Sequence, residues 1–560
     1  MNKKTVGKVL LIAAGILLVG IAFYITLPPI SIFSMDFWRF LLFIDIVVFV
    51  EYLLLKKTDG ERVIDGGIHI TFENGRIVKQ NGKSLKKFKF LKWQIILTAA
   101  AVLFVIIGSV VGSTLFRAKT YSSLITVEEQ PFEEGVAPTE YVSDIALMDT
   151  ASAQIIGART LGTLSDLVSQ YNVSSDYTQI AMRDKADSVS KPYKVAPLEH
   201  ASFFKWLKNR RAGIPGYVKV DTVGFDAEFV RLTECNIRYS PSAYFSDNLY
   251  RALRFRFPTA IFGKISFEVD DSGHPFWVAS VMKPRAGLFG AMDVDYVVTL
   301  DACTGECASY APGDSPDWID IVYYGDLICQ KFDWYGMLRE GYFNSAFGQT
   351  NCVVTTEDFG YKIIGNDVYI FTGVTSTSND EANIGFILSN ARNGEYKFFR
   401  VAGAEEFSAM SAAEGSVQQY RYKASFPSLI YVDGEATYIM VLKDASGIVK
   451  MYSMVNVRNY NIVVTGETQE DVFRRYRTAI GVGQNNTVTP ETEQTENVTV
   501  REIVYIVQSG ETVVYLKTDS GVFRVPFDES LLFVENGDEV TVRYSEKSEG
   551  VTEATVSSEE

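Results

Sequence analysis

The chain has 560 residues and a formal net charge of −15, and 47% of its residues are hydrophobic. This length is enough for several domains, and the acidic balance argues against a nucleic-acid ligand. Three histidines and five cysteines make a histidine-rich metal site improbable. The sequence has no Walker loop, G-x-S-x-G elbow or H-E-x-x-H pattern, so it predicts no catalytic, cofactor-binding or metal-ligating residue.

Three apolar stretches lie in the first 116 residues, and each is long enough to cross a hydrocarbon core about 30 Å thick. They predict transmembrane helices over residues 9–27, 37–55 and 93–116. The loop of residues 56–92 carries ten Lys or Arg against four Asp or Glu, and basic short loops stay in the cytoplasm. We therefore expect a multi-pass protein of the cell membrane, with its N-terminus inside and residues 117–560 extracytoplasmic.

Several features of this membrane domain have two interpretations. Asp45, mid-way along the second stretch, could serve an ion or proton path, but three helices make a poor transport path and favour a hydrogen bond between helices. Gly108 and Gly112 form a G-x-x-x-G pattern, which is typical of close helix packing. Residues 68–80 are expected to form a small hairpin. The loop also holds a lysine run that predicts contact with anionic lipid headgroups: Lys83, Lys86, Lys87, Lys89 and Lys92.

After the membrane domain the charge changes sign. The first 116 residues carry +7, which leaves −22 on the rest of a chain of −15. Residues 117–139 contain two prolines and show no periodicity, which predicts a tether. Residues 140–263 indicate a mixed α/β domain with a helix over 198–211. A second helix is expected over 240–257, with Ser240 as its N-cap.

Residues 264–480 are rich in strands and repeat one local pattern. An apolar strand is followed by a turn that begins with Asp or Asn and closes with Gly, and then by a second strand. A helix is expected between the second and third hairpins, from about residue 316 to 329. The pattern predicts four antiparallel hairpins, with turns at residues 270–273, 301–305, 390–394 and 444–447.

Candidates for chemistry in this region are few. Cys303 and Cys307 flank a predicted turn and could bridge, although two small residues at strand ends are the simpler interpretation. His69 is expected on the opposite side of the membrane from His200 and His274. Three acidic pairs could serve a hydrolase, but solvated loops and helix starts explain them as well: Asp293/Asp295, Asp314/Asp317 and Glu405/Glu406.

The C-terminal part begins with a polar linker over residues 481–499. Residues 500–545 hold four or five short strands, which predict a small β-barrel of OB or SH3-like type. Residues 546–560 form an acidic tail that is expected to be disordered. The predicted fold class is α+β, with three N-terminal transmembrane helices, an α+β region rich in antiparallel hairpins, and the small barrel.

The segment of residues 265–320 resembles PepSY modules. The resemblance rests on strand and turn residues: Phe267-Glu-Val-Asp270, Gly273, Pro275-Phe-Trp277, Val298, Asp301, Thr304-Gly-Glu306, Tyr310 and Pro316-Asp-Trp318. The whole chain is also similar to uncharacterised membrane proteins of Gram-positive bacteria, through Pro197-Leu-Glu199, Phe204-Lys-Trp206 and Gly213-Ile-Pro-Gly216. PepSY modules occur in protease propeptides and envelope proteins, so the resemblance implies binding or restraint of another exported protein and transfers no catalytic residue.

We therefore expect a membrane-anchored envelope protein that binds or regulates an exported protein or a wall component, without a cofactor. Two alternatives stay open. One is an envelope hydrolase with an unrecognised carboxylate site, and the other is a transporter accessory subunit that uses Asp45. Aromatic grooves would favour the binding protein, whereas a deep pocket lined by carboxylates would favour the hydrolase. The sequence does not fix the oligomeric state.

Overall fold

The structure is a computed structural model. It describes residues 3–58, 69–73, 76–80, 89–142, 145–183, 190–377, 379–481, 494–508, 511–527, 531, 534–544 and 551–557. Helices make up 34% and strands 35%, so the α+β class is confirmed. The chain divides into two compact units, Met1–Ile480 and Gly481–Glu560, which we describe one at a time.

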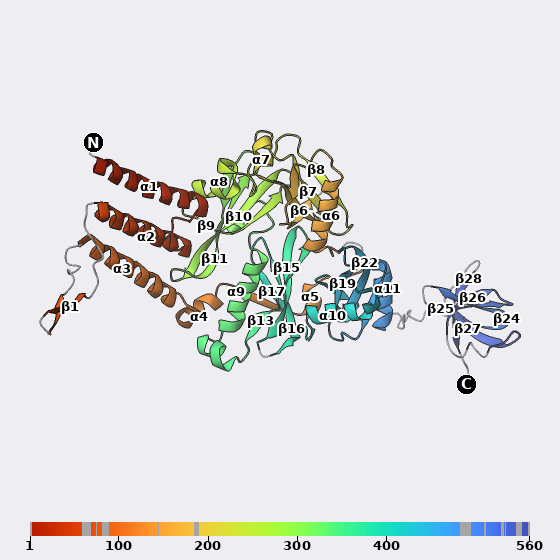
Figure 1. Ribbon diagram of the computed structural model, residues 1–560. Helices are drawn as coiled ribbons and strands as arrows, with labels where there is room; N and C mark the ends of the chain where they lie inside the picture. The colour runs from red at the N-terminus through yellow and green to blue at the C-terminus, as the bar shows by residue number, and fades with distance from the viewer. Residues whose placement is uncertain are drawn as a thin grey trace. The chain divides into compact units, whose positions relative to one another are not determined.

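Three long helices begin the first unit: α1 (Lys3–Thr26), α2 (Met35–Thr58) and α3 (Lys89–Val111) (Figure 1). Among the described residues, Thr5–Thr26 and Phe90–Val111 are long and apolar enough to cross a membrane. The α2 helix does not meet that measure, because Arg39, Asp45 and Glu51 interrupt its apolar run. Between α2 and α3, the strands β1 (His69–Glu73) and β2 (Arg76–Gln80) pair antiparallel.

Residues 114–480, here called the α+β region, contain four sheet units, each a helix followed by four antiparallel strands in sequence order. Sheet unit one has α6 (Thr150–Gly162), β5 (Thr178–Arg183), β6 (Ser190–His200), β7 (Gly216–Asp221) and β8 (Ala227–Arg231). Sheet unit two has α8 (Leu249–Arg256), β9 (Ile261–Val269), β10 (Pro275–Ala286), β11 (Gly290–Asp301) and β12 (Cys307–Tyr310).

Sheet unit three has α9 (Gly325–Leu338), β14 (Gly360–Ile364), β15 (Asp367–Ser376), β16 (Asn379–Asn390) and β17 (Tyr396–Phe399). Sheet unit four has α10 (Glu406–Ser416), β20 (Ser428–Val432), β21 (Glu435–Lys443), β22 (Val449–Asn456) and β23 (Val463–Gly466). Short strands extend the edges: β4 (Tyr171–Val173), β13 (Val353–Thr355), β18 (Gly403–Ala404) and β19 (Lys423–Ala424). Two further helices are α7 (Phe203–Asn209) and α11 (Gln469–Ala479).

The last residue of the third strand is Asp or Asn in every sheet unit, and its side chain accepts backbone N–H groups of the following turn. Asp221 accepts from Val223 and Gly224 at 2.8 and 3.0 Å. The equivalent residues are Asp301, Asn390 and Asn456. All four hairpins expected from the sequence are present. However, the turns at 270 and 301 belong to one sheet unit, so the structural repeat is longer than one hairpin.

The segment of residues 117–139 is not a tether, and that prediction is wrong. The α4 helix (Thr114–Ser122) packs against α9, and β3 (Val127–Gln130) pairs parallel with β17. The short α5 helix (Phe132–Gly135) inserts Phe132, only 3% exposed, into the core shared by sheet units three and four. The two helices bury one side chain each, Tyr121 and Phe132, and every residue of β3 is partly or fully exposed, so the segment has too little periodicity to be recognised in the sequence.

The α+β region is also attached to the N-terminal helices at two further places. Buried Arg254 of α8 donates from Nε to the carbonyl oxygen of Leu27, just after α1, at 2.9 Å. At the other place, the β10–β11 hairpin packs on the end of α3. A Cβ atom at Gly108 would lie 2.1 Å from Leu288 Cδ1, and one at Gly112 would lie 2.8 Å from the backbone oxygen of Ala286. The small residues therefore admit a hairpin, where we had expected another helix.

At four of the predicted helices the observed boundaries differ from the prediction. Residues 198–200 belong to β6, and α7 begins after Ser202, which caps it. The α8 helix begins after Asn248, since residues 240–248 form turns and a short 3-10 helix, and ends close to the predicted residue 257. The α9 helix begins at Gly325, because the preceding residues form a short 3-10 helix, a turn and bends, with Ile319 and Val322 buried. Likewise, α3 ends at Val111 rather than residue 116.

The second unit is a small β structure. Its strands are β24 (Gln494–Gln508), β25 (Glu511–Thr518), β26 (Val522–Pro526), β27 (Glu539–Tyr544), β28 (Val551–Glu553) and β29 (Thr555–Ser557). The C-terminal segment pairs with β26 through β28 and with β27 through β29, so the pairings close on themselves. The predicted linker is wrong for residues 494–499, which pair with β27, and the predicted disordered tail is wrong for residues 551–557, which complete the sheet. Residues 482–493, 546–550 and 558–560 of those two predictions lie outside the described residues.

Candidate functional site

A cavity of about 350 Å³ lies where sheet units one, three and four meet. Sheet unit one contributes residues 146–150 before and in α6, Gln179 of β5 and Lys194 of β6. Sheet unit three contributes residues 358–361 and Phe371, and the chain before and in β20 contributes residues 426–428. Its walls come from segments far apart in the sequence, and its volume suits a small ligand or a few residues of a peptide.

Lys194 supplies a positive charge to this cavity. It is buried in β6, directly before the apolar residues 195–198, and its Nζ donates to Thr150 Oγ1 at 3.2 Å. The same amine lies 5.3 Å from the ring centroid of Tyr361. Burial lowers the pKa of Lys194 to about 8, and nearby Asp149 opposes this effect. The amine is therefore mostly protonated at neutral pH.

Two carboxylates also line the cavity, and their surroundings differ. Asp149 caps α6 by accepting from Ser152 N at 2.8 Å, and it is paired with Lys443. Burial raises the pKa of Asp149, but the hydrogen bonds from Lys443 and Ser152 outweigh it and leave the pKa below its ordinary value. Burial raises the pKa of Asp358, and the hydrogen bond from the backbone N–H of Phe359 only partly offsets this.

Aromatic rings form much of the remaining wall. Phe359, Tyr361, Phe371 and Phe426 all line the cavity, and the Phe371 and Phe426 ring centroids are 5.8 Å apart. Burial raises the pKa of Tyr361, so its hydroxyl stays protonated. One cationic group beside an apolar wall is an arrangement that binds a ligand with an anionic group next to an apolar one.

Neither a known protein family nor a characterised protein matches the sequence. Two solved structures of Synechocystis apocarotenoid oxygenase mutants share 8% identity with the chain, at TM-scores of 0.14 and 0.13. The alignments cover 69% and 67% of this chain, and it spans 61% and 59% of the oxygenase chains. TM-scores of this size carry no argument about fold or function.

The acidic pairs singled out in the sequence lie elsewhere, and one member of each pair binds a side chain or backbone group of another element. Asp293 pairs with buried Lys331 at 2.7 Å, and Asp317 pairs with Arg392 at 3.2 Å. Glu406 is fully buried and accepts from Gly373 N and Thr356 Oγ1 at 2.6 and 3.2 Å. None of the six paired residues lines the described cavity.

Asp45 joins two of the membrane-domain helices. Its carboxylate accepts from Gln94 Nε2 at 3.0 Å and from Thr98 Oγ1 at 2.7 Å, both in α3. The expected hydrogen bonding between helices is thus present in the structure. Of the lysine run, residues 83–88 lie outside the described part of the chain, while Lys89 and Lys92 belong to α3.

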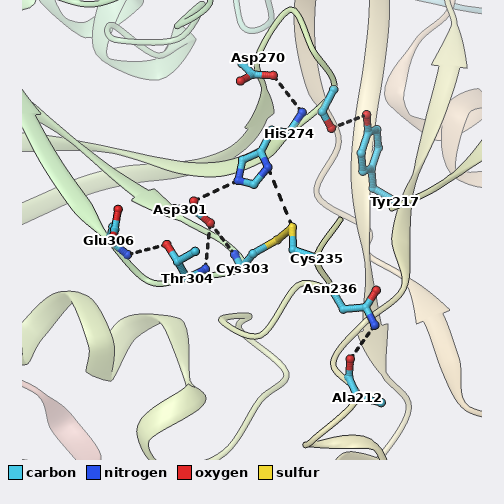
Figure 2. Close-up of a disulfide and its surroundings, with 11 residues drawn as sticks. Ala212, Tyr217, Cys235, Asn236, Asp270, His274, Asp301, Cys303, Thr304 and Glu306 are labelled. Atoms are coloured by element: carbon cyan, nitrogen blue, oxygen red, sulfur yellow. Dashed lines mark hydrogen bonds and ion pairs between the residues drawn. A yellow bond between two sulfur atoms is a disulfide. The ribbon is translucent and has the colours of Figure 1, made fainter. Parts of the chain in front are cut away.

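Cys303 is bonded to Cys235, so the interpretation of Cys303 as a small unpaired residue is wrong (Figure 2). Cys307 is not bonded to it, and the Cys307 thiol donates to the backbone oxygen of Gly305 at 3.6 Å. The bonded cysteines are 68 positions apart in the sequence, and most of sheet unit two lies between them, so local turn chemistry gave no signal for this pair.

Few residues in the sequence indicate the cavity. Its main signal is Lys194, a charged residue that interrupts an apolar strand, and such a residue is buried only where it has a partner or a role. Asp149 and Asp358 look like ordinary loop residues until the three sheet units are assembled.

Proposed function

We propose that this chain is a membrane-anchored cell-envelope protein whose α+β region binds an exported protein or a wall component through the cavity at Lys194. The observation that carries the proposal is a buried, mostly protonated amine in the wall of an aromatic cavity between three sheet units. Burying a protonated amine lowers the stability of the folded state, and a bound anionic group would offset that loss.

The location rests on the membrane helices and the loop charges. We infer that α1, α2 and α3 all cross the membrane, with the basic loop of residues 56–92 inside and the α+β region outside. The Arg254 contact and the β10–β11 hairpin support an α+β region held at the membrane surface. A partner would then be captured close to the bilayer.

The chemistry of the cavity limits the class of ligand that it can bind. Lys194 favours a carboxylate, and the rings of Phe359, Phe371 and Phe426 favour an apolar or aromatic neighbour of that carboxylate. A free peptide C-terminus with an apolar last residue has both features. Exported proteins and wall peptides can each present one, and the PepSY resemblance of residues 265–320 agrees with a peptide or protein partner.

The test uses the full chain in detergent or nanodiscs and short peptides that differ only in a free or an amidated C-terminus. We expect free-carboxylate peptides to raise the melting temperature of the wild type, by an amount equivalent to about 2.7 kcal/mol at 100 times Kd. Lys194→Met should abolish this shift. Lys362→Met is the matched control, because Lys362 is also a partly buried lysine of lowered pKa but does not line the cavity.

Two results would contradict the proposal: no difference between free and amidated peptides, or an unchanged shift in Lys194→Met. A panel of wall-derived and acidic peptides then separates the two sources of carboxylate. Binding of one class alone would identify the partner, and binding of neither would remove the cavity as the recognition site.

One observation favours the hydrolase as a second candidate. Asp149 and Asp358 line the same cavity, and their pKa values are displaced in opposite directions, a pattern found in acid–base pairs. The structural roles of Asp149 at α6 and Lys443 argue for the binding protein. Asp358→Asn discriminates: it should leave peptide binding nearly unchanged, whereas loss of turnover on wall material with binding retained would establish the hydrolase.

A further inference from the structure

Cys235, Cys303 and His274 lie together at the turn that ends β11, away from the cavity residues. We propose that, when the two cysteines are reduced, these three side chains bind one thiophilic cation such as Zn²⁺ or Cu⁺. The Cys235–Cys303 disulfide is then the metal-free, oxidised state of the same site. This inference is independent of the proposed ligand of the cavity.

The ligand atoms are already close together. The two Sγ atoms and a ring nitrogen of His274 all lie within 4.8 Å of one another, and His274 Nδ1 is 4.0 Å from Cys235 Sγ (Figure 2). Two thiolates and an imidazole are ligands that Zn²⁺ and Cu⁺ prefer. Two thiolates also neutralise a divalent cation, which lowers the cost of placing it in a partly buried site.

Asp301 orients the histidine for this role. Its Oδ2 lies 3.0 Å from His274 Nε2, so the carboxylate holds the ring proton on Nε2 and leaves the Nδ1 lone pair facing the sulfur atoms. A carboxylate on the far nitrogen is the usual companion of a metal-bound histidine. The other oxygen of Asp301 accepts from Cys303 N at 2.8 Å, so one side chain positions two of the three ligands.

The backbone holds the ligands in place without the disulfide. Arg238 N and Tyr239 N both donate to the backbone oxygen of Ala302, at 2.9 and 3.0 Å. Trp277 Nε1 donates to the backbone oxygen of Tyr239 at 2.8 Å. These bonds tie the segment after Cys235 to the residue before Cys303, so reduction leaves the two thiols facing each other.

The disulfide and the cation-bound site cannot form at the same time in one chain. Reduction of the disulfide by a dithiol adds two electrons and two protons, giving two thiols and oxidising the reductant to its own disulfide. Cation binding then releases both protons, and metal-bound thiolates are no longer free to form the disulfide. Cys235 and His274 are partly exposed, so a cation can enter from solvent and Zn²⁺ can take water as its fourth ligand.

The first test reduces the full chain in detergent, removes the reductant without oxygen, and titrates Zn²⁺, Cu⁺ and the spectroscopic probe Co²⁺ separately. We expect one cation per reduced chain, none per oxidised chain, and a sulfur-to-cobalt charge-transfer band. Cys235→Ser and His274→Ala should lose the band. Cys307→Ser is the matched control, since Cys307 lies on the same hairpin but is not a ligand, and it should keep the full band.

Asp301→Asn keeps an oxygen for the turn but removes the carboxylate from His274, and it should weaken binding by roughly 10–100-fold. The double variant Cys235→Ser/Cys303→Ser should fold, with the wild-type circular dichroism spectrum, and bind no cation. The proposal is overturned if the reduced wild type binds no more cation than Cys235→Ser, if His274→Ala binds as tightly as wild type, or if the double variant does not fold.

Discussion

Replacing Lys194 with Met should make the protein more stable while removing ligand binding. The pKa of Lys194 falls from 10.5 to about 8 because the amine is buried. At about 1.4 kcal/mol per pH unit, keeping the buried amine protonated at neutral pH costs roughly 3 kcal/mol. The variant also loses the hydrogen bond to Thr150, worth about 1 kcal/mol. The free energy of unfolding of Lys194→Met should therefore exceed that of the wild type by about 2 kcal/mol.

The direction of this stability change can be tested by varying the pH. The folded state holds this proton less tightly than the unfolded state, so the cost is fully present below pH 8 and disappears as the pH rises towards 10.5. Thermal unfolding of the full chain in detergent should give a higher melting temperature for Lys194→Met at pH 7 and a smaller difference at pH 10. A lower melting temperature at pH 7, or a difference that does not change with pH, would refute this reasoning.

Three further outcomes are expected. Arg254→Ala should lower stability by about 1–3 kcal/mol, because it leaves the partly buried carbonyl of Leu27 and the buried carbonyl of Ala260 without this donor, whereas exposed Arg256→Ala should not; melting curves of both variants check this. Burial raises the pKa of Glu406 to about 7, so its contribution to stability should fall as the pH rises from about 4.5 to 7, and Glu406→Gln should flatten the pH profile of unfolding. A fragment of residues 481–560 should show dispersed β-type amide resonances and one of residues 500–545 should not, because Val498 and Ala554 of the core are missing from the shorter one.

The elements that the sequence predicted well are those built from local chemistry. The hairpins at Asp301 and Asn390 follow from an Asx side chain that bonds its own turn and a glycine of positive φ, such as Gly305 and Gly394. The equivalent turn at Asn456 was missed, because no glycine closes it and the strand after it is short. The apolar helices α1 and α3 follow from composition alone.

What the sequence did not predict depends on contacts between distant segments. The burial of Phe132 needs sheet units three and four, the pairing of Cys235 with Cys303 needs the segment after sheet unit one to lie on sheet unit two, and the cavity at Lys194 needs three sheet units. The predicted helix starts were wrong for a similar reason. Ser240-Pro241 is a good local start signal, but the chain there bonds back to Asn248 and begins its helix only afterwards.

The proposed role in capturing exported partners depends most directly on the side of the membrane that each part of the chain occupies. The decisive measurement is labelling of intact cells with a membrane-impermeant thiol reagent. The background carries Cys307→Ser, Cys329→Ser and Cys352→Ser, which removes the three cysteines outside the disulfide. We predict that a cysteine introduced by Ser84→Cys is protected until the cells are lysed, while one introduced by Thr487→Cys reacts at once. Labelling at residue 84 and protection at residue 487 would place the cavity in the cytoplasm and contradict a role in capturing exported partners.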